Sequence, residues 1–400
     1  MAGIAACFGE GAETVVERIL DGFTCRMRGP RTISKGPGFA IGGVGAGPVQ
    51  SGAVVAVIDG VVHNYAQLAA EMRAEGHKLT TKEAAEVACA LYAEFGPDGE
   101  RLLDGEFAMI LAGPGGEPFL SRDRYSGTPL FYGATASGGL AAGSERAAVE
   151  AVAADVRELP AATYYASRIG ELTYFDPARG SAYITDEAAA LALAGYHVLE
   201  AVERRIGGAE RVAVISDGGV ASKLVAAYAQ QLGARVEVFV PRGAAQSLMD
   251  LSSAFEVPVV EVDATAAAGP CAKSSPEPER VTWYAALAQA ASEREHSVVL
   301  TAAGSDELFG AASITPLKKP EDTHELLRRQ AAARSNGIFT SVAAAGAASG
   351  VQLRAVFADP NVAMAAWELS PALKYREGRP GWPLERLLAR ALTATKVPTG

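Results

Sequence analysis

Short apolar runs alternate with longer amphipathic segments through the second half of the chain. The short runs have the length and β-branched content of buried parallel strands. The longer segments have the apolar spacing of helices. The expected strands are 212–215, 235–240, 257–262 and 297–301, and the expected helices are 186–205, 221–232 and 281–293. This alternation predicts a doubly wound parallel sheet, in which ligands bind beyond the carboxyl ends of the strands.

The first half of the chain has a different pattern. Residues 1–10 begin with an apolar run that suits a buried strand. Residues 52–68 predict a strand, a turn at Asp59–Gly60 and then a helix. Residues 155–185 alternate polar and apolar positions and contain Asp176–Pro177, which predicts a linker with short strands.

The length of the chain, 400 residues, favours two domains. The composition, with 49% hydrophobic and 20% charged residues, is that of an ordinary soluble globular protein. We place the boundary near residues 175–185 and therefore expect domains at 1–178 and 179–400.

Charge and cysteine content narrow the expected partners and compartment. The net charge of −10 argues against nucleic acid or a membrane surface as a partner. No apolar run reaches the roughly 18 residues that a membrane span needs, and no signal peptide is recognisable. The cysteines, which are Cys7, Cys25, Cys89 and Cys271, show neither paired nor metal-ligand spacing. We expect a cytoplasmic protein with free thiols.

The stretch 211–223 carries the clearest candidate site. Gly218 and Gly219 follow the run Val212–Ile215 and let the backbone turn tightly before a helix that starts near Ala221. A strand, a glycine-rich turn and a helix N-terminus together form an anion site, usually for phosphate. The alternative is a plain β–turn–α connection, because a single Gly-Gly turn is weak evidence.

Two further stretches strengthen the first interpretation. Residues 211–223 resemble the pyrophosphate loop of asparagine synthetase and its relatives, Ser-Gly-Gly-Leu-Asp-Ser-Ser. Residues 299–310 are similar to the family's second signature, Gly-Glu-Gly-Ser-Asp-Glu-Leu-Phe-Gly, and residues 350–359 to its third, Gly-Leu-Glu-x-Arg-x-Pro-Phe-Leu-Asp. The resemblance implies an N-terminal αββα sandwich of the N-terminal-nucleophile type. It also implies a C-terminal doubly wound sheet of the ATP-pyrophosphatase type.

The first domain resembles class II glutamine amidotransferases, although its catalytic positions differ. Ala2 stands where the family has the nucleophilic cysteine, and Cys7 would lie mid-strand without a free α-amine beside it. Asp59 replaces the asparagine of the oxyanion hole, and Ala84 replaces an aspartate that would hold the amine of glutamine. We expect a retained sandwich without glutaminase activity.

The second domain keeps part of the family's ATP site. The resemblance assigns ATP and pyrophosphate binding to the loop residues and Mg²⁺ to Asp306. Asp217 stands where the family has serine, and it could be a displaced metal ligand or could repel a triphosphate. The expected nucleotide-binding residues are Ser216, Asp217, Gly218, Gly219, Ser222, Lys223 and Gly304, with Arg354 and Lys396 as catalytic candidates. The degenerate positions of this domain are Ala221, Ala303 and Gln352.

Structural alternatives exist for several of these residues. Asp306 and Glu307 could cap a helix. Arg354 and Asp359 could form a structural ion pair, and Lys396 could be a solvated lysine near the C-terminus.

Two functions of different classes follow from the resemblance. The first is an ATP- and Mg²⁺-dependent amide ligase that needs no glutamine, as in β-lactam synthetases and lasso-peptide cyclases, and that acts on a small-molecule or peptide carboxylate. The second is a pseudoenzyme that scaffolds or regulates an active homologue, which the substitutions at Ala221, Ala303 and Gln352 favour. A homodimer is a further expected assembly.

Overall fold

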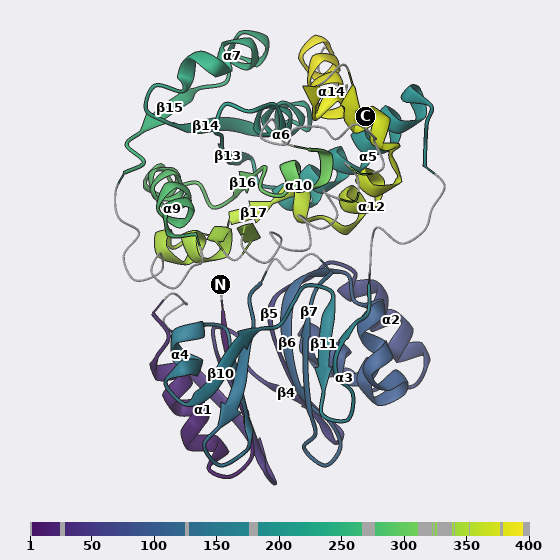
Figure 1. Ribbon diagram of the computed structural model, residues 1–400, viewed down its shortest axis with the longest axis vertical. Coiled ribbons are helices and arrows are strands. Elements are labelled where there is room, and N and C mark those ends of the chain that lie inside the picture. Colours follow the sequence, from purple (N-terminus) through teal and green to yellow (C-terminus); the bar gives the residue numbers. More distant parts are fainter. Residues whose placement is uncertain are drawn as a thin grey trace. The chain divides into compact units, whose positions relative to one another are not determined.

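The computed structural model describes residues 2–24, 29–124, 128–175, 183–265, 277–310, 338–339, 341–351, 353–376 and 379–394, with the single positions 322 and 325. The chain divides into two compact units, Met1–Asp176 and Pro177–Gly400. Each unit has its own sheets and its own core, and each is a mixed α/β structure (Figure 1).

The first unit contains two antiparallel sheets of six strands each. One sheet has the order β10-β8-β9-β1-β3-β2, and the other has the order β12-β11-β7-β6-β5-β4. The strands of the first sheet are β1 (Gly3–Phe8), β2 (Arg31–Gly36), β3 (Phe39–Val44), β8 (Phe131–Thr135), β9 (Leu140–Gly143) and β10 (Ala153–Glu158). Those of the second are β4 (Val49–Ser51), β5 (Val54–Val62), β6 (Gly105–Ala112), β7 (Pro118–Arg122), β11 (Thr163–Ala166) and β12 (Gly170–Thr173).

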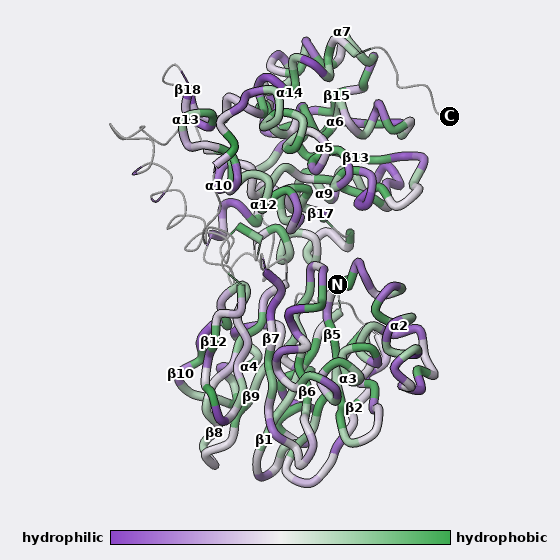
Figure 2. Tube along the Cα trace, turned by 90° about the vertical axis from the view of Figure 1, so that its right-hand side faces the viewer, coloured by the Kyte–Doolittle hydropathy of each residue, from purple (hydrophilic) through white to green (hydrophobic). Residues whose placement is uncertain are grey.

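Helices cover the outer face of each sheet of the first unit. Helices α1 (Ala12–Asp21) and α4 (Arg146–Glu150) pack on the sheet that contains β1. Helices α2 (Tyr65–Ala74) and α3 (Ala84–Phe95), the latter continued by the 3₁₀ helix η1 (Gly96–Leu102), pack on the sheet that contains β5. Figure 2 shows hydrophobic stretches along α3 and β6.

The central core of this unit lies between the two sheets. Ile4 and Ile41 from one sheet meet Val57 and Ile110 from the other, and all four side chains are buried. The resulting helix–sheet–sheet–helix layering follows from strands whose alternate side chains face two apolar layers.

Two sequence-based expectations for this unit are wrong. No turn occurs at Asp59–Gly60, because β5 continues through both residues and pairs with Ala108 and Phe107 of β6. Residues 155–173 contain the expected short strands but are not a linker, because β10, β11 and β12 are hydrogen-bonded members of the two sheets. Backbone pairing along a neighbouring strand outweighs the local turn preference of an Asp-Gly pair.

The second unit contains a parallel sheet of five strands in the order β15-β14-β13-β16-β17. The strands are β13 (Arg211–Ile215), β14 (Arg235–Pro241), β15 (Val259–Val262), β16 (Val299–Thr301) and β17 (Leu353–Ala355). Four of them match the expected runs, whereas β17 was not expected as a strand. The parallel sheet predicted from the alternation is confirmed.

Helices lie on both faces of this sheet (Figure 1). Helix α9 (Pro278–Glu293) and the helical residues 341–349 pack on one face. Helices α5 (Glu187–Ile206), α6 (Val220–Gln231) and α14 (Trp382–Thr393) pack together on the other face. The remaining elements are η2 (Ala245–Leu248), α7 (Met249–Phe255), α10 (Ser305–Phe309), η3 (Val356–Ala358), α12 (Pro360–Glu368), α13 (Pro371–Lys374), β18 (Tyr375–Arg376) and β19 (Arg379–Pro380).

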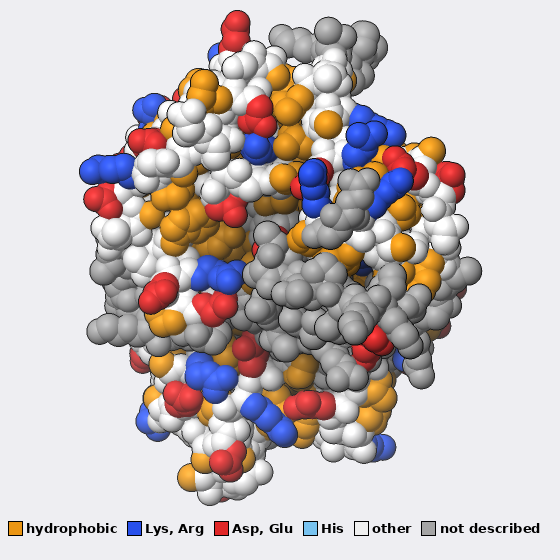
Figure 3. Space-filling view, turned by 45° about the horizontal axis from the view of Figure 1, so that its top comes forward, with side chains coloured by type: hydrophobic (Ala, Val, Ile, Leu, Met, Phe, Trp, Pro, Cys, Tyr) orange, Lys and Arg blue, Asp and Glu red, His pale blue; other side chains and the backbone are white. Residues whose placement is uncertain are grey.

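The charged side chains that are visible in Figure 3 are interspersed in sign. Lys and Arg side chains lie beside Asp and Glu side chains over the described part of that face. Such mixing gives a weak net field over that face rather than a concentrated one.

Candidate functional site

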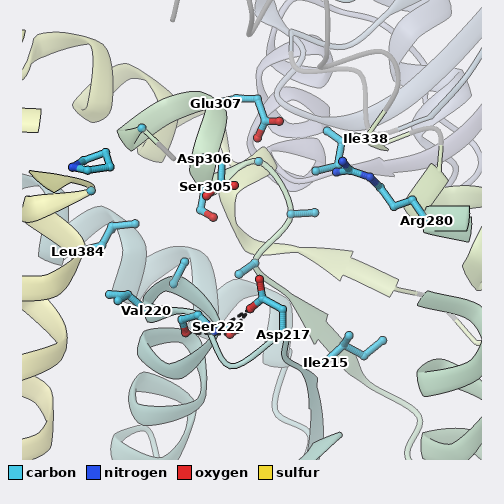
Figure 4. A pocket seen from close by; sticks show the side chains of 18 of the residues that line it. Ile215, Asp217, Val220, Ser222, Arg280, Ser305, Asp306, Glu307, Ile338 and Leu384 are labelled. Atoms are coloured by element: carbon cyan, nitrogen blue, oxygen red, sulfur yellow. Dashed lines mark hydrogen bonds between the residues drawn. The ribbon is translucent and has the colours of Figure 1, made fainter. Parts of the chain in front are cut away.

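A cavity of about 630 Å³ opens at the carboxyl ends of β13 and β16 in the second unit. The strand order reverses between these two strands, since β13 leads outward to β14 and β15 whereas β16 leads outward to β17. Ligands of open parallel sheets bind at such a switch point. Figure 4 shows side chains from the loop after β13, from α10 and from α9 around the cavity.

The loop after β13 forms the lower wall of the cavity in Figure 4. Gly218 has φ of 85°, and a Cβ at this position would lie 2.1 Å from Oγ of Ser247. Only glycine fits a left-handed position with so close a neighbour. Gly219 is the N-cap of α6, and because it has no side chain the first helical turn is open to the cavity.

The carboxylate of Asp217 occupies the anion-binding face of this loop. Its Oδ1 accepts hydrogen bonds from the backbone N–H of Gly219, at 2.8 Å, and from the hydroxyl of Ser222, at 3.1 Å. The hydroxyls of Ser216 and Ser222 are 2.7 Å apart, and the N–H of Gly218 donates to Ser216 Oγ at 2.9 Å. Donors at a helix N-terminus attract anions. In this structure the carboxylate of Asp217 is the anion that these donors bind.

Lys223 does not point into the cavity. Its ammonium group forms an ion pair with Asp250, at 2.9 Å, and also donates to the carbonyl of Ser247. Lys223 is not among the described residues that line the cavity. A role for Lys223 in binding phosphate therefore requires the ion pair with Asp250 to open.

The loop after β16 forms the opposite wall. Gly304 has φ of 94° and precedes α10, and a Cβ at this position would lie 2.7 Å from the ring of Phe339. Asp306 and Glu307 lie in the first turn of α10, whereas Gly304 holds the N-cap position. Gly304 and Asp306 both line the cavity, as do Ala221 and Ala303, where the resemblance would place carboxylates.

The cavity also takes side chains that the sequence interpretation missed. Arg280, Trp283 and Tyr284 come from α9, and Leu384 and Glu385 come from α14. Burial raises the pKa of Tyr284 to about 12. The expected helix 281–293 carried no signal for which of its faces would meet a ligand, so sequence periodicity could not select these residues.

The catalytic candidates lie elsewhere or outside the described residues. The guanidinium of Arg354 donates to the carbonyl of Arg205, and Arg354 is not among the described lining residues. Asp359 pairs with Arg204 at 2.8 Å and Arg205 at 2.9 Å, so the expected Arg354–Asp359 ion pair is wrong. Gln352 and Lys396 lie outside the described residues.

The positions of the first unit that the resemblance implies to be degenerate lie around β1 and β5. Ala2 directly precedes β1, and Asp59 is buried in β5 with Oδ2 3.5 Å from Oγ of Ser144. Ala84 begins α3. Cys7 is buried in the middle of β1, and burial raises its thiol pKa to about 11, which disfavours a nucleophilic thiolate.

Two negative observations apply to the described part of the chain. No three side chains of His, Cys, Asp or Glu there lie close enough together to hold a metal ion by themselves. No helix there combines the length and apolar character needed to cross a membrane.

Comparison with known proteins shows which parts of the chain resemble other sequences. Residues 40–173 match the glutamine amidotransferase domain family. The chain is also 27% identical over 187 residues to asparagine synthetase [glutamine-hydrolyzing] 2 of Oryza sativa subsp. japonica. It is 33% identical over 119 residues to asparagine synthetase B [glutamine-hydrolyzing] of Escherichia coli K12. Part of the chain is therefore similar to asparagine synthetase-like glutamine amidotransferases.

The similarity to these synthetases is partial. The aligned part makes up 46% of this chain and 31% of the rice protein, and 30% of this chain and 21% of the E. coli protein. The chain therefore matches less than a third of the length of either curated relative. The amidotransferase match lies within the first unit, whereas the cavity lies in the second.

Proposed function

We propose that this protein is an ATP-dependent ligase that joins a carboxylate to an amine without using glutamine. In this reaction a carboxylate oxygen attacks the α-phosphorus of ATP, and pyrophosphate leaves. The amine nitrogen then attacks the acyl carbon, loses a proton, and releases AMP. The observation that carries the proposal is the cavity at the switch point, which gathers Asp217, Gly219 and Ser222 on one side and Gly304 and Asp306 on the other.

The residues of the cavity suit a magnesium–nucleotide complex. Mg²⁺ prefers one or two carboxylates together with phosphate oxygens and water, rather than a site made only of protein ligands. Asp306 is a carboxylate in the wall of the cavity, opposite the loop after β13. Asp306 would hold Mg²⁺, and the N–H of Gly219 and the hydroxyl of Ser222 would hold phosphate.

Asp217 sets a condition on this binding. Its carboxylate already accepts from Gly219 and Ser222, so a phosphate group must displace it. We therefore favour a competing role for Asp217 over a role as the second metal ligand. Asp217→Ser should strengthen ATP–Mg²⁺ binding by about tenfold, because a repelling charge is removed and the loop donors become available.

Calorimetry with ATP–Mg²⁺ tests both points. The wild type should bind, and Asp217→Ser should bind more tightly. Asp263→Ser is the matched control, since Asp263 follows β15 of the same sheet and accepts from Thr265, but is not among the described residues that line the cavity. Weaker binding by Asp217→Ser would assign Asp217 to the metal instead. Pyrophosphate release on addition of a carboxylate substrate would then test adenylation.

A second candidate function is a scaffold or regulator that has lost catalysis. The observation in its favour is the same loop: Asp217 fills it, and Ala221 and Ala303 bring no carboxylate to the cavity. If neither the wild type nor Asp217→Ser binds at millimolar ATP–Mg²⁺, the ligase proposal fails and the scaffold is the better account.

Under the ligase proposal, the first unit would serve a structural role. Ala2 offers neither thiol nor hydroxyl, and buried Asp59 would oppose the negative charge of a tetrahedral intermediate. The nitrogen of the new amide would therefore come from an amine on the substrate. A small-molecule or peptide substrate that carries both groups would meet this requirement.

A further inference from the structure

Glu385 brings a carboxylate to the wall of the cavity at a place that the proposed phosphate and metal sites do not use. It lies in the first turn of α14, it is half-buried, and it lines the cavity together with Gly381 and Leu384. Figure 4 shows Leu384, the residue before Glu385, on the side of the cavity opposite to Arg280. The start of α14 therefore forms a wall of its own, across the cavity from α9.

The carboxylate of Glu385 has neither an ion pair nor a hydrogen bond among the described residues. Two arginines of the same part of the chain have other partners. Arg376 pairs with Glu187, and the guanidinium of Arg386 lies over the ring of Trp382, 6.0 Å from its centroid. A carboxylate that lines a cavity without a partner charge can accept a charge-assisted hydrogen bond from a ligand.

The described lining of the cavity carries more negative than positive side chains. Its cationic side chain, Arg280, already pairs with Glu277 at 3.0 Å. The carboxylates are those of Asp217, Asp306, Glu307 and Glu385. A cavity with an excess of one charge attracts ligands of the opposite charge. Even with Asp306 committed to Mg²⁺, the wall at Glu385 favours a cationic group over an anionic one.

Apolar side chains also line the cavity. Leu384 is buried directly before Glu385, and Val220 and Ile338 line the cavity from other elements. Ligand sites commonly combine apolar walls with a few polar groups that fix the orientation of the ligand. A positive charge at the end of an alkyl chain meets both requirements, because its methylene groups can cover apolar surface while the charge meets Glu385.

We propose that Glu385 binds the amine substrate of the ligase, by accepting a hydrogen bond from a primary ammonium group at the end of an alkyl chain. The inference rests on the proposed function, for which it names the class of amine and the wall of the cavity that recognises it. The role of Glu385 is one of substrate binding and includes no bond-making step.

Calorimetry with hexylamine tests the assignment on the full chain, with hexanol as an uncharged analogue of the same length. The wild type should bind hexylamine more tightly than hexanol. Glu385→Gln should weaken the binding of hexylamine by about tenfold and leave that of hexanol unchanged, because only the amine makes a charge-assisted contact. Glu385→Lys should reverse the preference, so that hexanoate binds more tightly than hexylamine.

Glu279→Gln is the matched control. Glu279 also lies in the first turn of a helix, α9, but its side chain is exposed and it is not among the described residues that line the cavity. A carboxylate in a first helical turn stabilises the helix, so both glutamine variants should lower the midpoint of thermal unfolding slightly. Only Glu385→Gln should change the affinity for hexylamine.

The outcomes separate this inference from the proposed function. Equal affinity of the wild type and Glu385→Gln for hexylamine, or no binding of hexylamine by the wild type at millimolar concentrations, overturns the role of Glu385. The ligase proposal then still stands if the wild type binds ATP–Mg²⁺. Weaker ATP–Mg²⁺ binding by Glu385→Gln, with unchanged affinity for hexylamine, would assign Glu385 to the metal and also overturn the inference. If hexylamine binding depends on Glu385 but the wild type does not bind ATP–Mg²⁺, the amine site stands and the ligase proposal fails.

Discussion

Glu100 is a buried glutamate in η1 whose two carboxylate oxygens have no hydrogen-bond partner among the described residues. Burial raises its pKa to about 8, and the charge of Asp123 adds to the rise. In the unfolded chain the pKa is about 4.3. Between these values the unfolded state releases a proton that the folded state keeps, so stability falls as pH rises from about 4.3 to 8.

Glu100→Gln should remove this penalty. We expect the variant to gain about 1–3 kcal/mol in free energy of unfolding, relative to the wild type, between pH 5 and pH 8. Urea unfolding at several pH values measures the difference. An equal difference between variant and wild type across this range would contradict the assignment.

Glu86 is the matched control, because it is as buried as Glu100 but fully hydrogen-bonded. Its carboxylate accepts from the backbone and hydroxyl of Thr80 and of Thr81 at 2.7–2.9 Å. Burial alone would raise its pKa, but these hydrogen bonds hold the pKa at about 2. Glu86→Gln should therefore destabilise the protein at neutral pH, with a deficit that shrinks as the pH falls from about 4.3 toward 2.

At the scale of residues, the sequence predicted some of the residues that line the cavity, but it did not predict the partners of their side chains. Asp217, Gly219, Ser222, Gly304 and Asp306 follow strand ends, and strand ends meet at one edge of a parallel sheet. The partners of those side chains depend on neighbours far along the chain or on rotamers. The ion pair of Lys223 with Asp250 and the turn of Asp217 back onto its own loop are of this kind, so pattern reasoning did not find them.

At the scale of elements, long periodic segments were predictable and short ones were not. The apolar spacing of α5 and α6 locates these helices within a few residues. Strand β17 has only Leu353–Ala355, which is too short for periodicity, and its place beside β16 is set by tertiary pairing. The failed turn at Asp59–Gly60 has the same cause, since the pairing of β5 with β6 lies outside any local window.

The junction of α5 and α12 depends on one buried carboxylate. Asp359 accepts a hydrogen bond from the N–H of Asn361 at the start of α12 and pairs with Arg204 and Arg205 of α5. Burial would raise the pKa of Asp359, but Arg205 and Arg204 hold it below its ordinary value. Asp359→Ala should lower the free energy of unfolding by about 3–5 kcal/mol, because it removes the charge that pairs with buried Arg205.

Asp186→Ala separates the ion pairs from helix capping in this test. Asp186 caps α5 by accepting from the N–H of Ala189 at 2.8 Å, and its side chain is exposed. Its loss should cost only about 0.5–2 kcal/mol. Similar costs for the two variants in denaturant unfolding would show that Asp359 acts mainly as a cap.

At the scale of the whole molecule, the match to the amidotransferase family lies in the first unit, whereas the proposed ligase chemistry lies in the second. The amidotransferase match covers residues 40–173 of the first unit, where the resemblance implies that Asp59 and Ala84 replace side chains that glutamine hydrolysis uses. The cavity for which we propose nucleotide binding lies in the second unit. A fold can outlast the chemistry it once carried, because packing and catalysis depend on different residues. The interdigitated core of Ile4, Ile41, Val57 and Ile110 needs none of the replaced side chains.

The purified protein should release no glutamate from glutamine. Ala2 supplies no nucleophile, and the carboxylate of Asp59 lies buried where the resemblance places an oxyanion donor. Ala2→Cys alone should not rescue hydrolysis, because Asp59 would still repel the oxyanion, whereas Ala2→Cys with Asp59→Asn removes that repulsion. Glutamate is measured against a boiled control. Release by the wild type above that control would mean that the first unit keeps a nucleophile, and the nitrogen of the proposed amide could then come from glutamine after all.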